Sequence, residues 1–201
     1  MAPVSEAITS LVLATRNPHK LAEFNRLLAP AGITVQPLPD DVMLPPEDGE
    51  TFADNAMPKA RTAARATGRR SIADDSGIES EALGGAPGVR SARYAGPEAS
   101  DQNNLDKLLR EAPAGSRLRY VCALAYVDPE SGEERIFFGE CSGRLARTPR
   151  GSRGFGYDPA FLPDGEHRER TMAELTEAEK DAISHRGEAA RALLRWLRGA
   201  G

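Results

Sequence analysis

Two segments of the 201-residue chain carry the charges that polyphosphate chemistry requires. In residues 15–20, small polar groups and a lysine follow a short apolar run, and a helix beginning there would present its positive end and Lys20 to one anion. In residues 74–77, Asp-Asp-Ser-Gly, adjacent carboxylates are costly unless a cation separates them or one keeps its proton. Such oxygen ligands favour Mg²⁺, to which Glu47 or Glu50 could add another. The simpler alternatives are a capped helix with a surface lysine and an Asp-rich turn.

Two later segments combine groups that suit a planar ring. Residues 154–158, Gly-Phe-Gly-Tyr-Asp, allow the backbone to approach a ligand, an aromatic to stack and Asp158 to accept ring N–H groups. Residues 184–187, Ser-His-Arg-Gly, follow Lys180, and Arg186 could donate to a base carbonyl or meet phosphate. A tight turn with core aromatics and a solvated basic face are the alternatives.

Lysine is scarce in this chain. Only four of the 26 basic residues are lysines, at positions 20, 59, 107 and 180. Arginine cannot always replace a compact ammonium, so the retained lysines indicate candidate sites, although codon bias would give the same composition. Lys107 lies on an expected helix between acids and leucines and is interpreted as a surface residue.

Capping and periodicity signals place these segments at the ends of helices and strands. Asn17 and Pro18 predict a helix start, Thr51 and Thr176 begin capping boxes, and Ser184 can cap a further helix. Pro58 should bend its helix or shift the start of that helix. The mixture of elements is typical of an α/β protein. We expect strands at 10–14, 33–38, 71–73, 117–127 and 134–142, and helices beginning at 18, at 52–67 closed by Gly68, at 101–111, and after 176 and 184.

The composition excludes several classes of protein. With 40% hydrophobic and 28% charged residues, the chain as a whole is neither disordered nor fibrous. A net charge of −4 argues against sequence-independent nucleic-acid binding, and no apolar run approaches the roughly 20 residues that span a bilayer. Cys122 and Cys141 have no metal-like spacing and are interpreted as buried apolar side chains, so a reduced, cytoplasmic location is the expectation.

The order of these motifs closely resembles the HAM1/inosine triphosphatase family of non-canonical purine nucleoside triphosphate pyrophosphatases. The resemblance extends from about Leu11 to Leu194 and depends on several motifs in sequence. These are residues 15–20 with Glu23 and Phe24, residues 50–52 with Asn55 and Lys59, residues 74–77, 83–88 and 91–94, residues 149–151 and 154–159, and residues 173–175 with Lys180 and 184–187.

The resemblance implies an enzyme that converts ITP, dITP and XTP to the monophosphate and pyrophosphate with Mg²⁺. It implies a single domain over residues 1–201, with two lobes, a central twisted mixed sheet flanked by helices, and the active site in the cleft between lobes. It also implies a homodimer with a small-molecule nucleotide substrate. From the net charge and the lack of a long apolar run, we expect no nucleic-acid or membrane partner.

The same resemblance assigns roles residue by residue. Asp75 would be the metal-linked acid and base beside Asp74, and Glu47 a further metal ligand. Phosphate would be neutralised by Lys59, Lys180 and Arg93. The segment Thr15, Arg16, Asn17, Pro18, His19 and Lys20 would hold the triphosphate near Ser76, while Phe155, Gly156, Tyr157, Asp158, His185 and Arg186 would surround the base.

Two residues, Arg16 and Pro58, could disturb the expected site, and two other functions are possible. Arg16 stands where the family often has a small residue and could crowd the phosphate turn, while Pro58 could tilt Lys59. Which of Asp74 and Asp75 is the base stays open, as does the means by which GTP is excluded. A Maf-type pyrophosphatase and a non-catalytic nucleotide-binding module are the alternative functions; the Asp pair argues against the latter.

Overall fold

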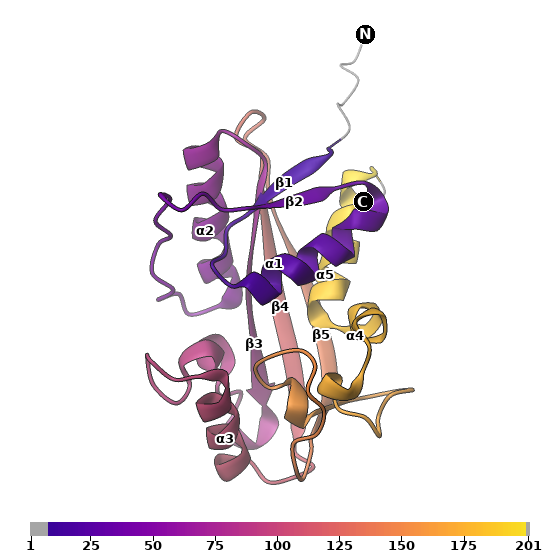
Figure 1. Ribbon diagram of the computed structural model, residues 1–201. Coiled ribbons are helices and arrows are strands. Elements are labelled where there is room, and N and C mark those ends of the chain that lie inside the picture. The colour runs from indigo at the N-terminus through magenta and orange to yellow at the C-terminus, as the bar shows by residue number, and fades with distance from the viewer. Residues whose placement is uncertain (1–7, 200–201) are drawn as a thin grey trace.

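The computed structural model describes residues 8–199, so both ends of the domain expected over residues 1–201 lie outside the described residues. The chain alternates between strands and helices, as the sequence predicted (Figure 1). Short 3-10 helices lie between some of these elements, at η1 (Ala29–Ala31), η2 (Glu81–Leu83), η3 (Gly88–Arg93), η4 (Asp158–Ala160) and η5 (Met172–Glu174). The strands are β1 (Ser10–Leu13), β2 (Thr34–Pro37), β3 (Ser71–Ser80), β4 (Arg117–Val127), β5 (Glu134–Leu145) and β6 (Phe161–Pro163), and the α-helices are α1 (Pro18–Leu28), α2 (Phe52–Thr67), α3 (Asp101–Glu111), α4 (Glu177–Ile183) and α5 (His185–Leu197).

One mixed sheet organises the described residues. Its strand order is β2-β1-β3-β4-β5-β6, with parallel pairing of β1 to β2 and β3, and antiparallel pairing from β3 onward. In Figure 1 the long strands β3, β4 and β5 extend from one end of the molecule to the other. Helices α1, α2 and α5 lie around one half, and α3 lies beside the other half.

Three apolar clusters match this division. One packs α1 and α5 on one face of the sheet, through side chains such as Phe24 and Leu193. A second packs the small residues of α2, including Ala56 and Ala60, on the opposite face. The third joins α3 to the far ends of β3, β4 and β5 around Ile78 and Phe161. The second and third clusters bury different parts of the same long strands, so the sheet is the common support of both halves.

Strand β3 corrects the sequence prediction. We expected a strand at 71–73 that ended in a turn at Asp74, but β3 continues to Ser80 and pairs with β4 residue by residue. Successive strand residues point to opposite faces of a sheet. Asp74 therefore shares the face of Ile72, towards α1 and α5, and Asp75 shares the face of Ala73, towards α2. The two carboxylates are neighbours in sequence only.

The helix predictions at 52–67 and 101–111 are confirmed to the residue, and Gly68 closes α2 in the left-handed conformation. The capping boxes at Thr51 and Thr176 are present. Pro58 lies inside α2 without shifting its start at Phe52. None of the helices within residues 8–199 combines the length and apolar character needed to cross a membrane.

Candidate active site

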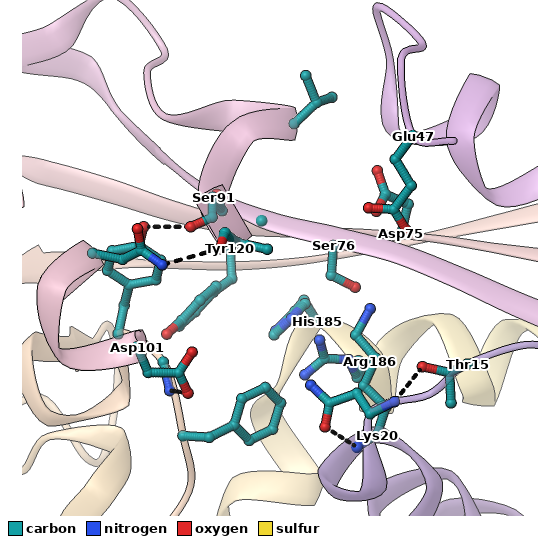
Figure 2. A pocket seen from close by; sticks show the side chains of 18 of the residues that line it. Thr15, Lys20, Glu47, Asp75, Ser76, Ser91, Asp101, Tyr120, His185 and Arg186 are labelled. Carbon is teal, nitrogen blue, oxygen red and sulfur yellow. Dashed lines mark hydrogen bonds between the residues drawn. The ribbon is translucent and has the colours of Figure 1, made fainter. Parts of the chain in front are cut away.

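A cavity of about 330 Å³ opens where the loop after β1, the middle of β3, the start of α5 and the 155–158 segment meet. Figure 2 shows Glu47 and Asp75 on one side of it, with Lys20, His185 and Arg186 projecting from the other. Most of the residues expected at the site line this cavity. They are Thr15, Arg16, Asn17, Lys20, Glu47, Lys59, Asp75, Ser76, Phe155, Gly156, Tyr157, Asp158, His185 and Arg186.

Asp74 lies behind the cavity wall and holds several cationic groups. It is 1% exposed, and its Oδ2 lies 2.9 Å from Lys20 Nζ and 3.2 Å from Arg186 Nε. Ser76 donates its hydroxyl to the same oxygen at 2.6 Å. Burial raises the pKa of Asp74, but Lys20, Arg186 and Lys59 outweigh burial and hold that pKa far below its ordinary value. Asp74 is thus a fixed anion with no tendency to take up a proton.

Asp75 has the opposite character. Its Oδ2 accepts a hydrogen bond from the Asn55 amide at 3.0 Å, and its Oδ1 lies 3.6 Å from Lys59 Nζ. Burial raises the pKa of Asp75 above its usual range, and the nearby Glu47 carboxylate raises it further, against Lys59 and Asn55. A carboxylate that lines a cavity and holds a proton more readily than usual suits proton transfer.

Lys59 joins the Glu47 loop to strand β3. Its Nζ donates to Glu47 Oε1 at 2.6 Å and to the Asp74 carbonyl at 2.9 Å. Arg93 does not line the cavity but donates to the carbonyl of Glu47 at 2.7 Å and so supports the loop that carries Glu47. Glu47, rather than Glu50, is therefore the loop acid that reaches the site.

The other end of the cavity is built on a second group of buried charges. Lys180 Nζ bridges Glu23 and Asp158, at 2.7 Å from each carboxylate. Arg186 NH1 lies 3.0 Å from the second oxygen of Glu23. Because Arg186 also contacts Asp74, a continuous chain of ion pairs joins Lys180 to Lys20. The solvated basic face considered for this segment is wrong, since Lys180 and Arg186 are buried.

Aromatic groups adjoin these charges. Phe155 lies with its ring centroid 5.1 Å from that of His19 and 5.2 Å from the cationic groups of Lys180 and Arg186. His19 and Lys180 line a second cavity, which Phe155 also borders. His185 is buried, and neither ring nitrogen has a hydrogen-bond partner among the described residues. Burial, with Arg186 and Lys180 nearby, lowers the pKa of His185 well below its usual value, so its imidazole is neutral.

The start of α1 differs from the prediction in one respect. We expected the positive end of this helix to face an anion, but the Asn17 side chain accepts from the backbone N–H groups of His19 and Lys20. The helix end therefore offers the Lys20 ammonium rather than those amides. Pro18 begins the helix without lining the cavity. The Arg16 guanidinium donates to the carbonyl groups of Leu38, Pro39, Asp40 and Val42, in the loop after β2.

Several residues of the site were not predicted from the sequence. Asn55 was named only as part of a motif, although it lies one helical turn before the predicted Lys59, and this i, i+4 spacing could have indicated a shared face towards Asp75. Glu23 follows Lys20 by three residues on the same helix and was named only as part of a motif. Tyr120, Asp101 and Asn104 also line the cavity, and no local pattern distinguishes them from ordinary strand and helix residues.

The residues present fit a divalent cation at one point of the cavity. Glu47 and Asp75 both face Lys59, and their mutual repulsion contributes to the raised pKa of Asp75. Mg²⁺ is usually held by one or two carboxylates together with substrate phosphates. Within residues 8–199, no group of three or more His, Cys, Asp or Glu side chains is placed to bind a metal on its own. The pair therefore suits a cation that arrives with a phosphate ligand.

The chain is similar to known proteins over nearly all of its length. A Ham1 family model matches residues 11–196. A dITP/XTP pyrophosphatase of Cutibacterium acnes is 45% identical over 195 residues, which cover 93% of this chain and 95% of that protein. One from Frankia alni is 49% identical over 199 residues, covering 94% and 96%. The solved structure of a HAM1 protein from Coxiella burnetii has a TM-score of 0.84 at 41% identity, covering 96% of this chain and 100% of that one.

This chain belongs to the Ham1 family. The family resemblance inferred from the sequence motifs and the α/β fold with a mixed, helix-flanked sheet are both confirmed.

Proposed function

We propose that this chain hydrolyses dITP, XTP and ITP to the nucleoside monophosphate and pyrophosphate, and so removes these nucleotides from the nucleotide pool. One observation supports this proposal above all. In a single cavity, the acidic pair Glu47 and Asp75 lies with Lys59 opposite a cluster of aromatic and charged residues suited to a purine. Relatives from Cutibacterium acnes and Frankia alni bear the name dITP/XTP pyrophosphatase. The family match gives no support to a Maf-type enzyme or a non-catalytic module.

In this proposal Asp75 is the base. A water molecule gives a proton to Asp75, its oxygen bonds to the α-phosphorus, and the bond from that phosphorus to the bridging oxygen of the β-phosphate breaks. Asn55 holds the second carboxylate oxygen and so orients the first. Without a bound cation, the pKa of Asp75 is raised and that of Asp74 is lowered, so Asp75 accepts a proton more readily than Asp74 does. Asp74 would therefore act by positioning Lys20 and Arg186 rather than by moving a proton.

Each lysine of the site is already paired with an acid, so its charge is not free to neutralise a substrate. Lys20 pairs with Asp74, Lys59 with Glu47, and Lys180 with Glu23 and Asp158. A triphosphate adds about four negative charges, so lysines alone cannot neutralise it. This supports a requirement for Mg²⁺, held by Glu47 and Asp75. When bound, Mg²⁺ would polarise phosphoryl oxygens and stabilise the charge that develops on pyrophosphate.

The opposite end of the cavity would select the base. Arg186 is a buried donor that could face the 6-keto oxygen of hypoxanthine or xanthine, and adenine carries an N–H₂ group there. Two donors facing each other leave both unpaired, at a cost of about 1–3 kcal/mol, or roughly tenfold to a hundredfold in rate. Lys180 belongs to this end through Asp158, more than to the phosphate end.

We further propose a cytoplasmic single-domain protein that assembles as a homodimer. Phe138 on β5 is a large apolar side chain that is 57% exposed, which supports a contact between copies. Sedimentation analysis at micromolar concentration tests the dimer, and the mass of a monomer would contradict it.

The experiment that tests the activity is a panel of nucleoside triphosphates assayed for pyrophosphate with and without Mg²⁺. The proposal predicts release from ITP, dITP and XTP only with the metal, and little release from ATP. Absence of pyrophosphate from all three, or release of orthophosphate instead, would contradict it.

A further inference from the structure

Tyr120 contacts Asp158 and His185, which lie at the end of the cavity proposed to bind the base, here called the base end. It lies in β4, is only 7% exposed and lines the cavity. Its hydroxyl donates to Asp158 Oδ1 at 3.1 Å. Its ring stacks on the imidazole of His185, with centroids 4.6 Å apart and planes inclined by 8°. Figure 2 shows Tyr120 projecting from the sheet between Asp101 and His185.

The hydrogen bonds of Asp158 leave one acceptor position open. Its Oδ2 accepts from Lys180 Nζ at 2.7 Å and from the backbone N–H of Phe155 at 3.0 Å. Among the described residues, Oδ1 accepts only from Tyr120. Because each carboxylate oxygen has about two lone-pair sites, Oδ2 is saturated and Oδ1 keeps one. The Tyr120 hydroxyl therefore fixes the direction of the remaining lone pair.

The protonation states of Tyr120 and His185 suit this arrangement. Burial and the Asp158 charge raise the pKa of Tyr120 well above its usual value, so its hydroxyl remains a donor at neutral pH. The stacked Tyr120 ring restricts rotation of the neutral His185 imidazole, which therefore presents one donor and one acceptor nitrogen in fixed directions.

We propose that Tyr120 is a positioning residue for base recognition, which holds Asp158 Oδ1 to accept a ring N–H of a 6-keto purine and holds His185 at the adjacent edge. The inference rests on the proposed function and deepens it. Hypoxanthine and xanthine carry a hydrogen on N1, whereas N1 of adenine is an unprotonated acceptor. An acceptor fixed at Asp158 therefore adds to the rejection of adenine, because two acceptors would face each other.

The test is Tyr120→Phe, which removes the hydroxyl and keeps the ring. We expect KM for ITP to rise about tenfold, as for the loss of one hydrogen bond to a charged group, and kcat to stay within about twofold. By calorimetry, inosine should bind about tenfold more weakly and inorganic tripolyphosphate should bind as before, because only inosine meets the base end. A merely structural role would weaken both ligands equally.

Tyr126→Phe is the matched control. Tyr126 lies on the same strand and the same face as Tyr120, and its ring contacts Trp196 in the last turn of α5, at 5.1 Å between centroids. This variant should leave both affinities unchanged.

The outcomes separate the two proposals. A wild-type protein that releases no pyrophosphate from ITP contradicts the proposed function. An active wild type with unchanged KM and inosine affinity in Tyr120→Phe contradicts only the role of Tyr120. Equal loss for inosine and tripolyphosphate, or failure of Tyr120→Phe to fold, also contradicts that role, because the hydroxyl would then support the fold rather than the base.

Discussion

At the scale of single residues, Asp74 and Asp75 divide two roles between adjacent positions. The alternation of β3 directs Asp74 to Lys20 and Arg186, and Asp75 to Asn55 and Lys59. The pKa of Asp74 is lowered and that of Asp75 is raised. Two carboxylates whose environments move their pKa values apart can serve different purposes in one site.

Asp75→Asn should abolish turnover without harming the fold. Loss of a general base lowers the rate by about 10²–10⁴-fold. Because the raised pKa means that the charged form is disfavoured in the folded protein, the variant should be at least as stable as the wild type at pH 7. Pyrophosphate release and thermal unfolding measure the two effects. Near-normal activity would remove Asp75 from the mechanism.

Asp74→Asn should act on stability. Breaking these buried ion pairs leaves Lys20 without its carboxylate partner and Arg186 with Glu23 alone, at a cost of about 3–5 kcal/mol in the free energy of unfolding. The folded pKa of Asp74 lies below the unfolded value of about 3.9, so its contribution is full above that pH and is lost as the pH falls. Urea unfolding should show a large difference from wild type at pH 7 and a smaller one near pH 3. Asp75→Asn, the same substitution one residue later, is the control.

At the scale of elements, the position of α5 depends on close packing against β5. A Cβ built on Gly139 would lie 2.1 Å from the carbonyl oxygen of His185 and 2.5 Å from the backbone nitrogen of Ala189. These are backbone atoms of α5, which cannot move without displacing the helix. The start of α5 carries His185 and Arg186, so the glycine fixes the distance of the base end from the sheet.

Gly139→Ala should therefore impair binding as well as stability. We expect a loss of about 1–3 kcal/mol from overpacking and an increase of about tenfold or more in KM for ITP from the displaced His185 and Arg186. Ser142→Ala, an exposed position on the same strand, is the control. A lower melting temperature with unchanged KM would show that α5 can adjust without moving the site.

The elements that the sequence predicted best are those with local signals. Helix α2 begins at the Thr51 capping box and ends at Gly68, so its bounds follow from neighbouring residues. Strand β3 was predicted too short because an Asp-Asp-Ser-Gly run is typical of turns, whereas its ten residues are held by pairing with β4 residues that lie 38 to 56 positions away in the sequence.

The sequence predicted the site residues that belong to recognisable motifs. It did not predict the contacts that those residues make with partners far away in the sequence. Lys20, Lys59 and Lys180 were identified, and so were Asp74, Glu47 and Asp158, but the sequence did not show which acid pairs with which lysine. The pairing of Lys180 with Glu23 joins helices 157 positions apart, and only the tertiary fold shows it. Tyr120 was missed because an aromatic residue in a buried strand is ordinary.

At the scale of the whole molecule, the cavity lies between the two ends of the sheet. Asp75 lies on β3 and Glu47 in the 38–51 loop, and the base end is formed by the 155–158 segment and α5, so a nucleotide bound as proposed would contact both halves. Such a ligand stabilises the folded protein in proportion to its affinity.

The Asp75→Asn protein with ITP and Mg²⁺ should show this stabilisation without turnover. At a ligand concentration near 100 times Kd the gain is about 2.7 kcal/mol, which raises the melting temperature by about 5–10 °C for a protein of this size. ATP at the same concentration should give a much smaller shift. Equal shifts with ITP and ATP would contradict recognition of the base by the α5 end.

In the proposed reaction, a water molecule activated by Asp75 attacks the α-phosphorus of the nucleotide. Hydrolysis of ITP in ¹⁸O-labelled water, followed by mass spectrometry of both products, shows which phosphorus is attacked. We expect one labelled oxygen in the inosine monophosphate and none in the pyrophosphate. Label in the pyrophosphate would place the attack at the β-phosphorus and contradict the mechanism.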